Sequence, residues 1–349
     1  MLVQKKAKVS ENFILDRAPE FYSLSWKKGT KLFAKKVEVF ITIDEDWTEQ
    51  LQVLEDREGN PALYTVRIET PVCADGECRL MHIRLYWDLL GNYAGYDKVK
   101  GYPFTKHDHD EFLLQDYIKL HLLLQDPNSI LERRKIDELV EKPEKPVVEG
   151  VDALSGATIK EVKESVVSGA LYSCYVAWHL VHGQVNEAIN MHTASILDDK
   201  LISTMLYGNN TAYQLFALKQ LKVHQYIEHQ QRLVFLLKKS TPLVRSYILK
   251  KLPDTIWQSE QQDPFWEAFS EIDVNSRSLM LEHIDKALDA TLIMLSYDVA
   301  LMTKNQLKKY LEKLKQIDVA KEIKQNLEKV IVSASYNYDY LIEDFLDRK

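Results

Sequence analysis

The sequence lacks any long apolar run. No stretch of its 349 residues approaches the roughly 18 consecutive apolar residues that cross a bilayer, so we expect no transmembrane segment. A secretory leader is missing too, because Gln4, Lys5 and Lys6 follow closely after Met1 and no apolar segment comes next. The sequence therefore predicts either a cytoplasmic protein or an exported protein whose leader is absent from this chain.

An excess of positive charge is also missing. The chain has 45 Lys and Arg against 52 Asp and Glu, a formal net charge of −7, which argues against a general nucleic-acid binder because such a protein needs a basic face. Hydrophobic residues make up 46% and charged residues 28%, the balance of a folded globular protein. The length is sufficient for two domains with separate cores.

Signatures of stand-alone catalysis are absent as well. The sequence contains no Gly-x-Ser-x-Gly elbow, no P-loop and no His-Glu-x-x-His, so we predict no catalytic residues of these kinds. The run from Lys106 to Glu111 holds two histidines, but the spacing fixes no third ligand. Asp108 or Asp110 would instead suit the N-cap of the following helix, so we predict no metal ligands.

Cysteine is scarce, with three in the chain. Cys73 and Cys78 flank the turn-like sequence Ala-Asp-Gly-Glu, which favours a short-loop disulfide and two free thiols about equally. A disulfide would fit an oxidising compartment. Cys174 lies in an apolar stretch and is predicted to be a small core residue.

The first half of the chain has the pattern of an α+β domain. Alternating apolar residues predict strands at 33–43, 62–69 and 79–88, whereas the Gly- and Tyr-rich segment 92–105 predicts a loop. Helical spacing begins near Asp110. A charged, proline-spaced linker at 141–146 follows, and residues 160–182 are helical again.

After Gly183 nearly every segment has helical periodicity, with breaks at turn and capping residues such as Thr241-Pro242 and Asp273. Short helices of similar length indicate stacked helical hairpins, loosely HEAT-like, while an irregular helical bundle fits about equally well. We therefore predict an α+β domain with an antiparallel sheet over residues 1–183, then an all-helical domain over residues 184–349.

The segment with the clearest chemistry is Asp152-Ala-Leu-Ser-Gly-Ala-Thr158, which directly precedes a helical pattern. Gly156 and Ala157 permit close backbone approach, and Ser155 and Thr158 suit helix capping. Unpaired N–H groups at such a turn favour a phosphate. A plain capping turn made of small residues is the alternative interpretation.

The pattern Asp-x-x-Ser-Gly-Ala-Thr resembles the flavinylation motif of FMN-binding domains in Rnf-type and sodium-translocating quinone reductase subunits. In that family a flavin transferase joins FMN through its phosphate to the last threonine. The resemblance covers at most a third of the chain, and Lys160 stands where the family usually has a hydroxyl residue. It implies that Thr158 is the attachment residue. The other matching positions are Asp152, Ser155, Gly156 and Ala157.

A flavin ring also needs flat apolar surfaces. An aromatic-rich region upstream could supply them, although core packing is the alternative for each residue. Its members are Tyr86, Trp87, Tyr93, Tyr96, Tyr102 and Phe104.

The resemblance implies an electron-transfer flavoprotein with covalent FMN, a redox carrier more than a stand-alone enzyme. Its helical half would dock an unidentified redox partner, and a tethered flavin would suit a periplasmic or other extracytoplasmic location, with a cytoplasmic one as the alternative. The rival hypothesis is a non-enzymatic helical-repeat scaffold fused to a degenerate, flavin-free FMN-binding fold.

Overall fold

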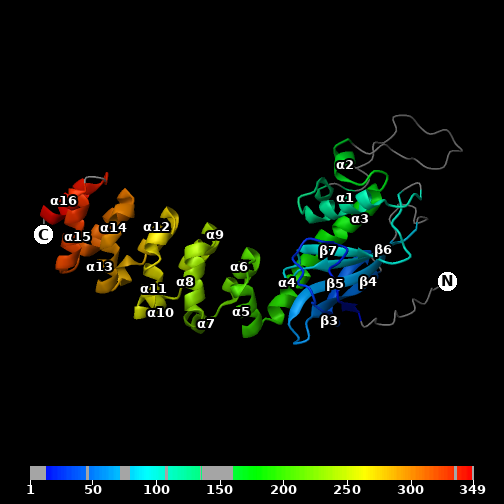
Figure 1. Ribbon diagram of the computed structural model, residues 1–349, viewed down its shortest axis with the longest axis horizontal. Helices are drawn as coiled ribbons and strands as arrows, with labels where there is room; N and C mark the ends of the chain where they lie inside the picture. The colour runs from blue at the N-terminus through cyan, green and yellow to red at the C-terminus, as the bar shows by residue number, and fades with distance from the viewer. Residues whose placement is uncertain are drawn as a thin grey trace. The chain divides into compact units, whose positions relative to one another are not determined.

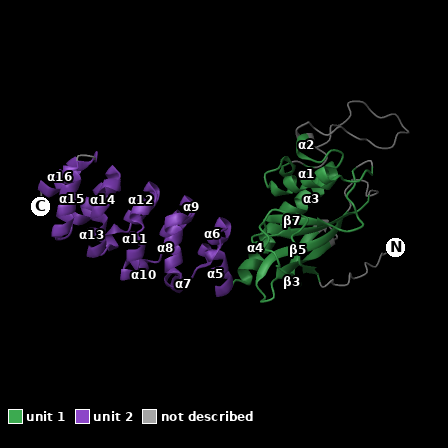
Figure 2. Ribbon diagram, viewed as in Figure 1, with its two compact units in different colours: residues 1–197 green, residues 198–349 purple. Residues whose placement is uncertain are grey.

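The computed structural model describes residues 13–44, 47–70, 79–106, 109–133, 135, 160–333 and 336–347. The chain divides into two compact units, residues 1–197 and 198–349 (Figure 2). The expected order of an α+β part followed by an all-helical part is confirmed. The boundary lies later than Gly183, because α4 (Val185–Ser195) packs against the sheet of the first unit.

The first unit is built on an antiparallel sheet, which Figure 1 shows with helices beside it. Its order over the described residues is β1-β3-β4-β5-β6-β7-β2, with every neighbouring pair antiparallel. The strands are β1 (Ile14–Leu15), β2 (Phe21–Tyr22), β3 (Leu32–Asp44), β4 (Trp47–Glu55), β5 (Pro61–Thr70), β6 (Met81–Trp87) and β7 (Tyr93–Lys98).

Successive side chains of a strand point to opposite faces of a sheet, and this alternation gives the first unit two cores. On one face Leu54, Leu63 and Tyr86 pack with residues of the N-terminal segment. On the other face Trp87 donates a hydrogen bond to the carbonyl of Val181 in α3. The helices of this unit are α1 (Leu114–Gln125), α2 (Lys160–Ser165), α3 (Leu171–His182) and α4, with the short 3₁₀ helix η1 at Ile130–Glu132.

The segment 92–105, predicted as a loop, contains strand β7, so that prediction is wrong for Tyr93–Lys98. Gly95, within this strand, is required by the tertiary structure. A Cβ atom at Gly95 would lie 2.3 Å from the carbonyl oxygen of Phe21, so only glycine lets β2 pair with β7. The following helix also begins later than Asp110, at Leu114, because Asp116 accepts a hydrogen bond from the Leu113 N–H.

The second unit consists of helical hairpins that stack in sequence order. Helices α6, α9, α12, α14 and α16 pack one on the next, as do α8, α11, α13 and α15. This order is that of a stack of hairpins, not of an irregular bundle. The helices are α5 (Asp199–Tyr207), α6 (Thr211–Gln220), α7 (Val223–Glu228), α8 (Gln230–Lys239), α9 (Pro242–Lys251), α10 (Asp254–Trp257), α11 (Asp263–Trp266), α12 (Val274–Leu281), α13 (Asp289–Tyr297), α14 (Lys304–Lys315), α15 (Lys321–Val332) and α16 (Asp339–Asp347).

Capping side chains stand at the start of the second helix in three of the hairpins. The side chains of Asn210, Asp273 and Thr303 each accept hydrogen bonds from N–H groups in the first turn of the helix that follows. Such caps satisfy backbone donors that have no partner inside the helix. The sequence therefore encodes the hairpin boundaries locally.

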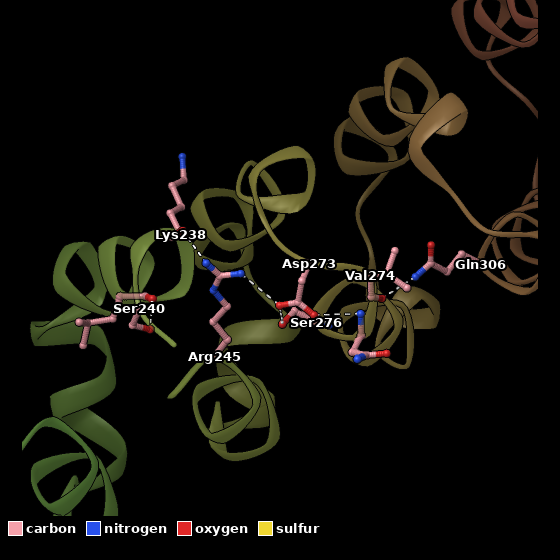
Figure 3. Close-up of polar contacts among 9 residues, drawn as sticks. Lys238, Ser240, Arg245, Asp273, Val274, Ser276 and Gln306 are labelled. Atoms are coloured by element: carbon pink, nitrogen blue, oxygen red, sulfur yellow. Dashed lines mark hydrogen bonds and ion pairs between the residues drawn. The ribbon is translucent and has the colours of Figure 1, made fainter. Parts of the chain in front are cut away.

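Asp273 also joins two hairpins. The Arg245 guanidinium, on α9, donates one hydrogen bond to the carbonyl of Lys238 and another to Asp273, both at 3.1 Å (Figure 3). Partial burial alone would raise the pKa of Asp273. Hydrogen bonds from Ser276, Arg245 and Asn275 outweigh that effect and lower the pKa to about 2.

Replacing Asp273 by alanine is expected to cost about 1 to 2 kcal/mol of unfolding free energy near pH 7. Because the folded-state pKa is lowered, this contribution is fully present above the unfolded pKa of about 4 and is lost as the pH falls toward about 2. Urea titrations of both proteins at several pH values, followed by hydrogen exchange in α12, measure the difference.

The matched control is Asn210→Ala, which removes a neutral cap with the same hydrogen bonds to the first turn. It should destabilise the stack by a similar amount, without the pH dependence between about 4 and 2. If the unfolding free energy lost in Asp273→Ala stayed constant through this pH range, the assignment of an ionised cap would be wrong.

Candidate functional site

The predicted flavin-attachment residues lie outside the described residues. These are Asp152, Ser155, Gly156, Ala157 and Thr158; Cys73, Cys78 and the linker at 141–146 also lie outside them. The structure does describe where the motif joins the fold, because α2 begins at Lys160, two residues after Thr158.

The segment that follows the motif is fixed in the core of the first unit. Val162 in α2 has no exposed surface, and Val166 and Val167 just after it are buried as well. The Val167 N–H donates to the Sγ of Cys174 at 3.4 Å. Burial raises the pKa of Cys174 to about 12, so this thiol stays protonated and is a core residue, as predicted.

Five of the six aromatic residues proposed as a ring-binding surface are core residues, and for them that hypothesis is wrong. Each phenol hydroxyl or indole N–H among them has a hydrogen-bond partner inside the unit. The Tyr86 hydroxyl, for example, donates to Asp97, and the Tyr96 hydroxyl donates to the carbonyl of Tyr117. The five buried residues are Tyr86, Trp87, Tyr93, Tyr96 and Phe104. Tyr102 alone of the six is exposed, at 48% of its surface.

Tyr102 stacks on His82, with ring centroids 3.9 Å apart and an angle of 27° between the planes. The pair lies beside an ion-pair cluster. Glu69 Oε1 is 3.5 Å from His82 Nδ1 and 3.4 Å from an Arg67 guanidinium nitrogen. Because Glu69 pairs directly with His82 across β5 and β6, the sheet register itself brings the carboxylate and the imidazole together.

These residues lie at the end of the sheet where β5 ends, β6 begins and β7 ends. The loop that leaves β7 continues from Tyr102 to Lys106. A Cβ atom at Gly169 would lie 3.5 Å from the Lys106 Cβ, so Lys106 packs against the connection between α2 and α3. The Lys106 ammonium is 2.9 Å from the Asp116 carboxylate at the start of α1. The loop that begins at Tyr102 therefore contacts the connection between α2 and α3 through Lys106.

His182 and Trp178, near the end of α3, have hydrogen-bond partners in and just after α1. His182 Nε2 lies 2.9 Å from the carbonyl oxygen of Leu124, and the Trp178 indole donates to the carbonyl of Asp126. Burial lowers the pKa values of His179 and His182, which favours the neutral rings. The C-terminal carbonyls of α1 and of the residue after it therefore bind this part of α3.

Metal ligation has no support in the parts of the chain that the structure describes. No group of three or more His, Cys, Asp or Glu there is arranged to hold a metal ion. Of the run considered in the sequence, His107 and Asp108 lie outside the described residues, and His109 is in a turn with φ of 64°.

Comparison with known proteins gives no relative. No family model matches the chain, and neither the curated proteins nor the solved structures include a match. Within the described ranges, no helix is both long and apolar enough to cross a membrane.

Sequence reasoning included Tyr102 but missed His82 and Glu69. The alternation along 62–69 and 79–88 places both residues in strands, yet their pairing depends on the register of β5 and β6. That register depends on which of the alternate side chains are buried, and a strand pattern alone does not specify it.

Proposed function

We propose that this protein is an electron-transfer flavoprotein that carries FMN through a phosphoester to Thr158. The motif Asp152-Ala-Leu-Ser-Gly-Ala-Thr158 is the observation that carries the proposal. The structure adds support, because the motif is followed within two residues by a helix whose Val162 is fully buried. A flavin attached there would be joined to a folded domain, not to a free tail.

The described residues near the motif fit a flavin in chemical terms. The threonine hydroxyl can form the phosphoester. The half-exposed ring of Tyr102 is a flat surface on the loop whose Lys106 packs against Gly169, in the connection after α2. The flavin itself would supply the redox chemistry, so the protein would need no acid or base for a chemical step. Covalent attachment would also keep FMN bound where free FMN is scarce, which favours an extracytoplasmic location.

The test is the intact mass of the full chain after co-expression with a flavin transferase. We expect a mass increase of one FMN less one water, with yellow colour, and the complete loss of both in Thr158→Val. Thr48→Val, an exposed threonine on β4, is the matched control and should be modified like the unaltered chain. An unmodified chain, made with a transferase that modifies a known substrate, would overturn covalent attachment.

The second candidate function is a non-enzymatic scaffold in which the helical unit binds another protein. Exposed large apolar side chains recur along its hairpins, and solvent-exposed apolar side chains that recur in this way are typical of binding surfaces. They include Tyr207, Phe235, Leu243, Tyr297 and Leu301. In the flavoprotein proposal the same unit docks the redox partner. The unmodified mass described above would leave partner binding as the better hypothesis.

A further inference from the structure

We propose that Tyr102, held against His82, is the surface on which the isoalloxazine ring of the flavin stacks. The inference rests on the proposed function for the identity of the ring, and it concerns residues that the structure describes in full. It adds a ring-binding site to an attachment site, since a phosphate tether alone does not orient the ring that transfers electrons.

Tyr102 is held in place before any ligand arrives. Its N–H donates to the carbonyl of Val99 in a turn where Gly101 adopts φ of +85°, a conformation that favours glycine. The stack on His82 covers one face of the phenol ring, and the residue keeps 48% of its surface exposed. A fixed aromatic face binds a planar ligand at low entropic cost, because little freedom remains to be lost.

The neighbouring charges suit a flavin ring as well. Arg67 and Glu69 lie beside His82 on the same face of the sheet. The redox properties of a flavin depend on charges and hydrogen bonds near its ring, and an ion pair next to the stacking surface provides both kinds of group. The apolar core residues of the first unit offer no such combination, since their rings are buried.

The place of Tyr102 in the fold also favours it as the ring-binding residue. Lys106, four residues further along the same loop, packs against Gly169 in the connection that follows α2. The motif enters the fold at α2, a helix of 6 residues whose length is about 9 Å. Within one unit, the loop that begins at Tyr102 is therefore linked to the connection after α2 through the contact of Lys106 with Gly169.

The test is a fluorescence titration of the full, unmodified chain with lumiflavin, which has the isoalloxazine ring but no ribityl phosphate. We expect saturable quenching of lumiflavin fluorescence, with a dissociation constant about tenfold weaker for Tyr102→Leu. Tyr102→Phe should bind like the unaltered chain, because it keeps the ring. Tyr340→Leu, which removes a tyrosine of similar exposure (46%) from α16, should also bind normally.

Equal binding by Tyr102→Leu and the unaltered chain, or no binding by either, would overturn the stacking proposal. Neither result depends on Thr158, so the titration separates failure of the ring site from failure of covalent attachment, which the mass measurement reports. Hydrogen exchange of the β5–β6 peptides confirms that Tyr102→Leu is folded.

Discussion

Replacing Trp87 by alanine is expected to lower the free energy of unfolding of the first unit by about 3 to 5 kcal/mol. The indole has no exposed surface, and its N–H donates to the carbonyl of Val181 at 3.1 Å. Truncation would leave a large cavity between β6 and α3 and remove the hydrogen bond from the indole to the Val181 carbonyl. Urea denaturation of the full chain, with hydrogen exchange of peptides from β5 to β7, measures the loss in this unit.

Two further variants separate the contribution of the buried area from that of the hydrogen bond. Trp87→Phe keeps much of the buried area and loses the hydrogen bond, so it should cost less than the alanine variant. Phe40→Ala removes an aromatic ring that is 50% exposed on β3 and should change stability only slightly. If Trp87→Ala were no more destabilising than Phe40→Ala, the assignment of Trp87 to the core would be wrong, and a surface role such as ring binding would return.

Gly91→Ala should destabilise the first unit by about 2 to 4 kcal/mol, for two additive reasons. Gly91 has φ of +76°, which strains any residue with a Cβ atom. An added Cβ would also lie 2.7 Å from the Cα of Asn186 in α4, too close for any rotamer change to relieve. We expect a lower denaturation midpoint and faster exchange in α4.

Gly59 is a closely matched control within the same sheet. Gly59 and Gly91 lie in turns of the same sequence pattern, Asp56-Arg-Glu-Gly-Asn60 and Asp88-Leu-Leu-Gly-Asn92. In each turn the aspartate carboxylate accepts hydrogen bonds from two backbone N–H groups. Gly59 has φ of +81° but no atom within 4 Å of an added Cβ. Gly59→Ala should therefore show only the conformational cost, about 1 to 2 kcal/mol. Equal losses at the two glycines would contradict a steric role for Asn186.

Much of the fold could be predicted because its signals are local. Alternation of apolar residues identified the strands at 33–43 and 62–69, and helical spacing with capping residues identified the second unit. The strand at Tyr93–Lys98 was missed because Gly95 reads as a loop residue, whereas its lack of a side chain is needed for β2 to pair there.

The candidate site could be predicted from the sequence only in part. The motif that ends at Thr158 is visible in the sequence and its attachment to FMN stays a prediction. The ring-binding surface could not be predicted as a set, because six neighbouring aromatic residues look alike in the sequence. Burial depends on which side of a strand each ring occupies and on what packs there, and this leaves Tyr102 at the surface and Trp87 in the core.

The two Asp-x-x-Gly-Asn turns show where the limit lies. The sequence by itself determines the turn, because the aspartate, the glycine and the asparagine interact with one another and with the backbone between them. Only the tertiary structure decides that Gly91 lies against α4 while Gly59 faces open space. Local hydrogen bonds depend on residues a few positions apart, whereas close packing depends on which distant segment arrives at that point.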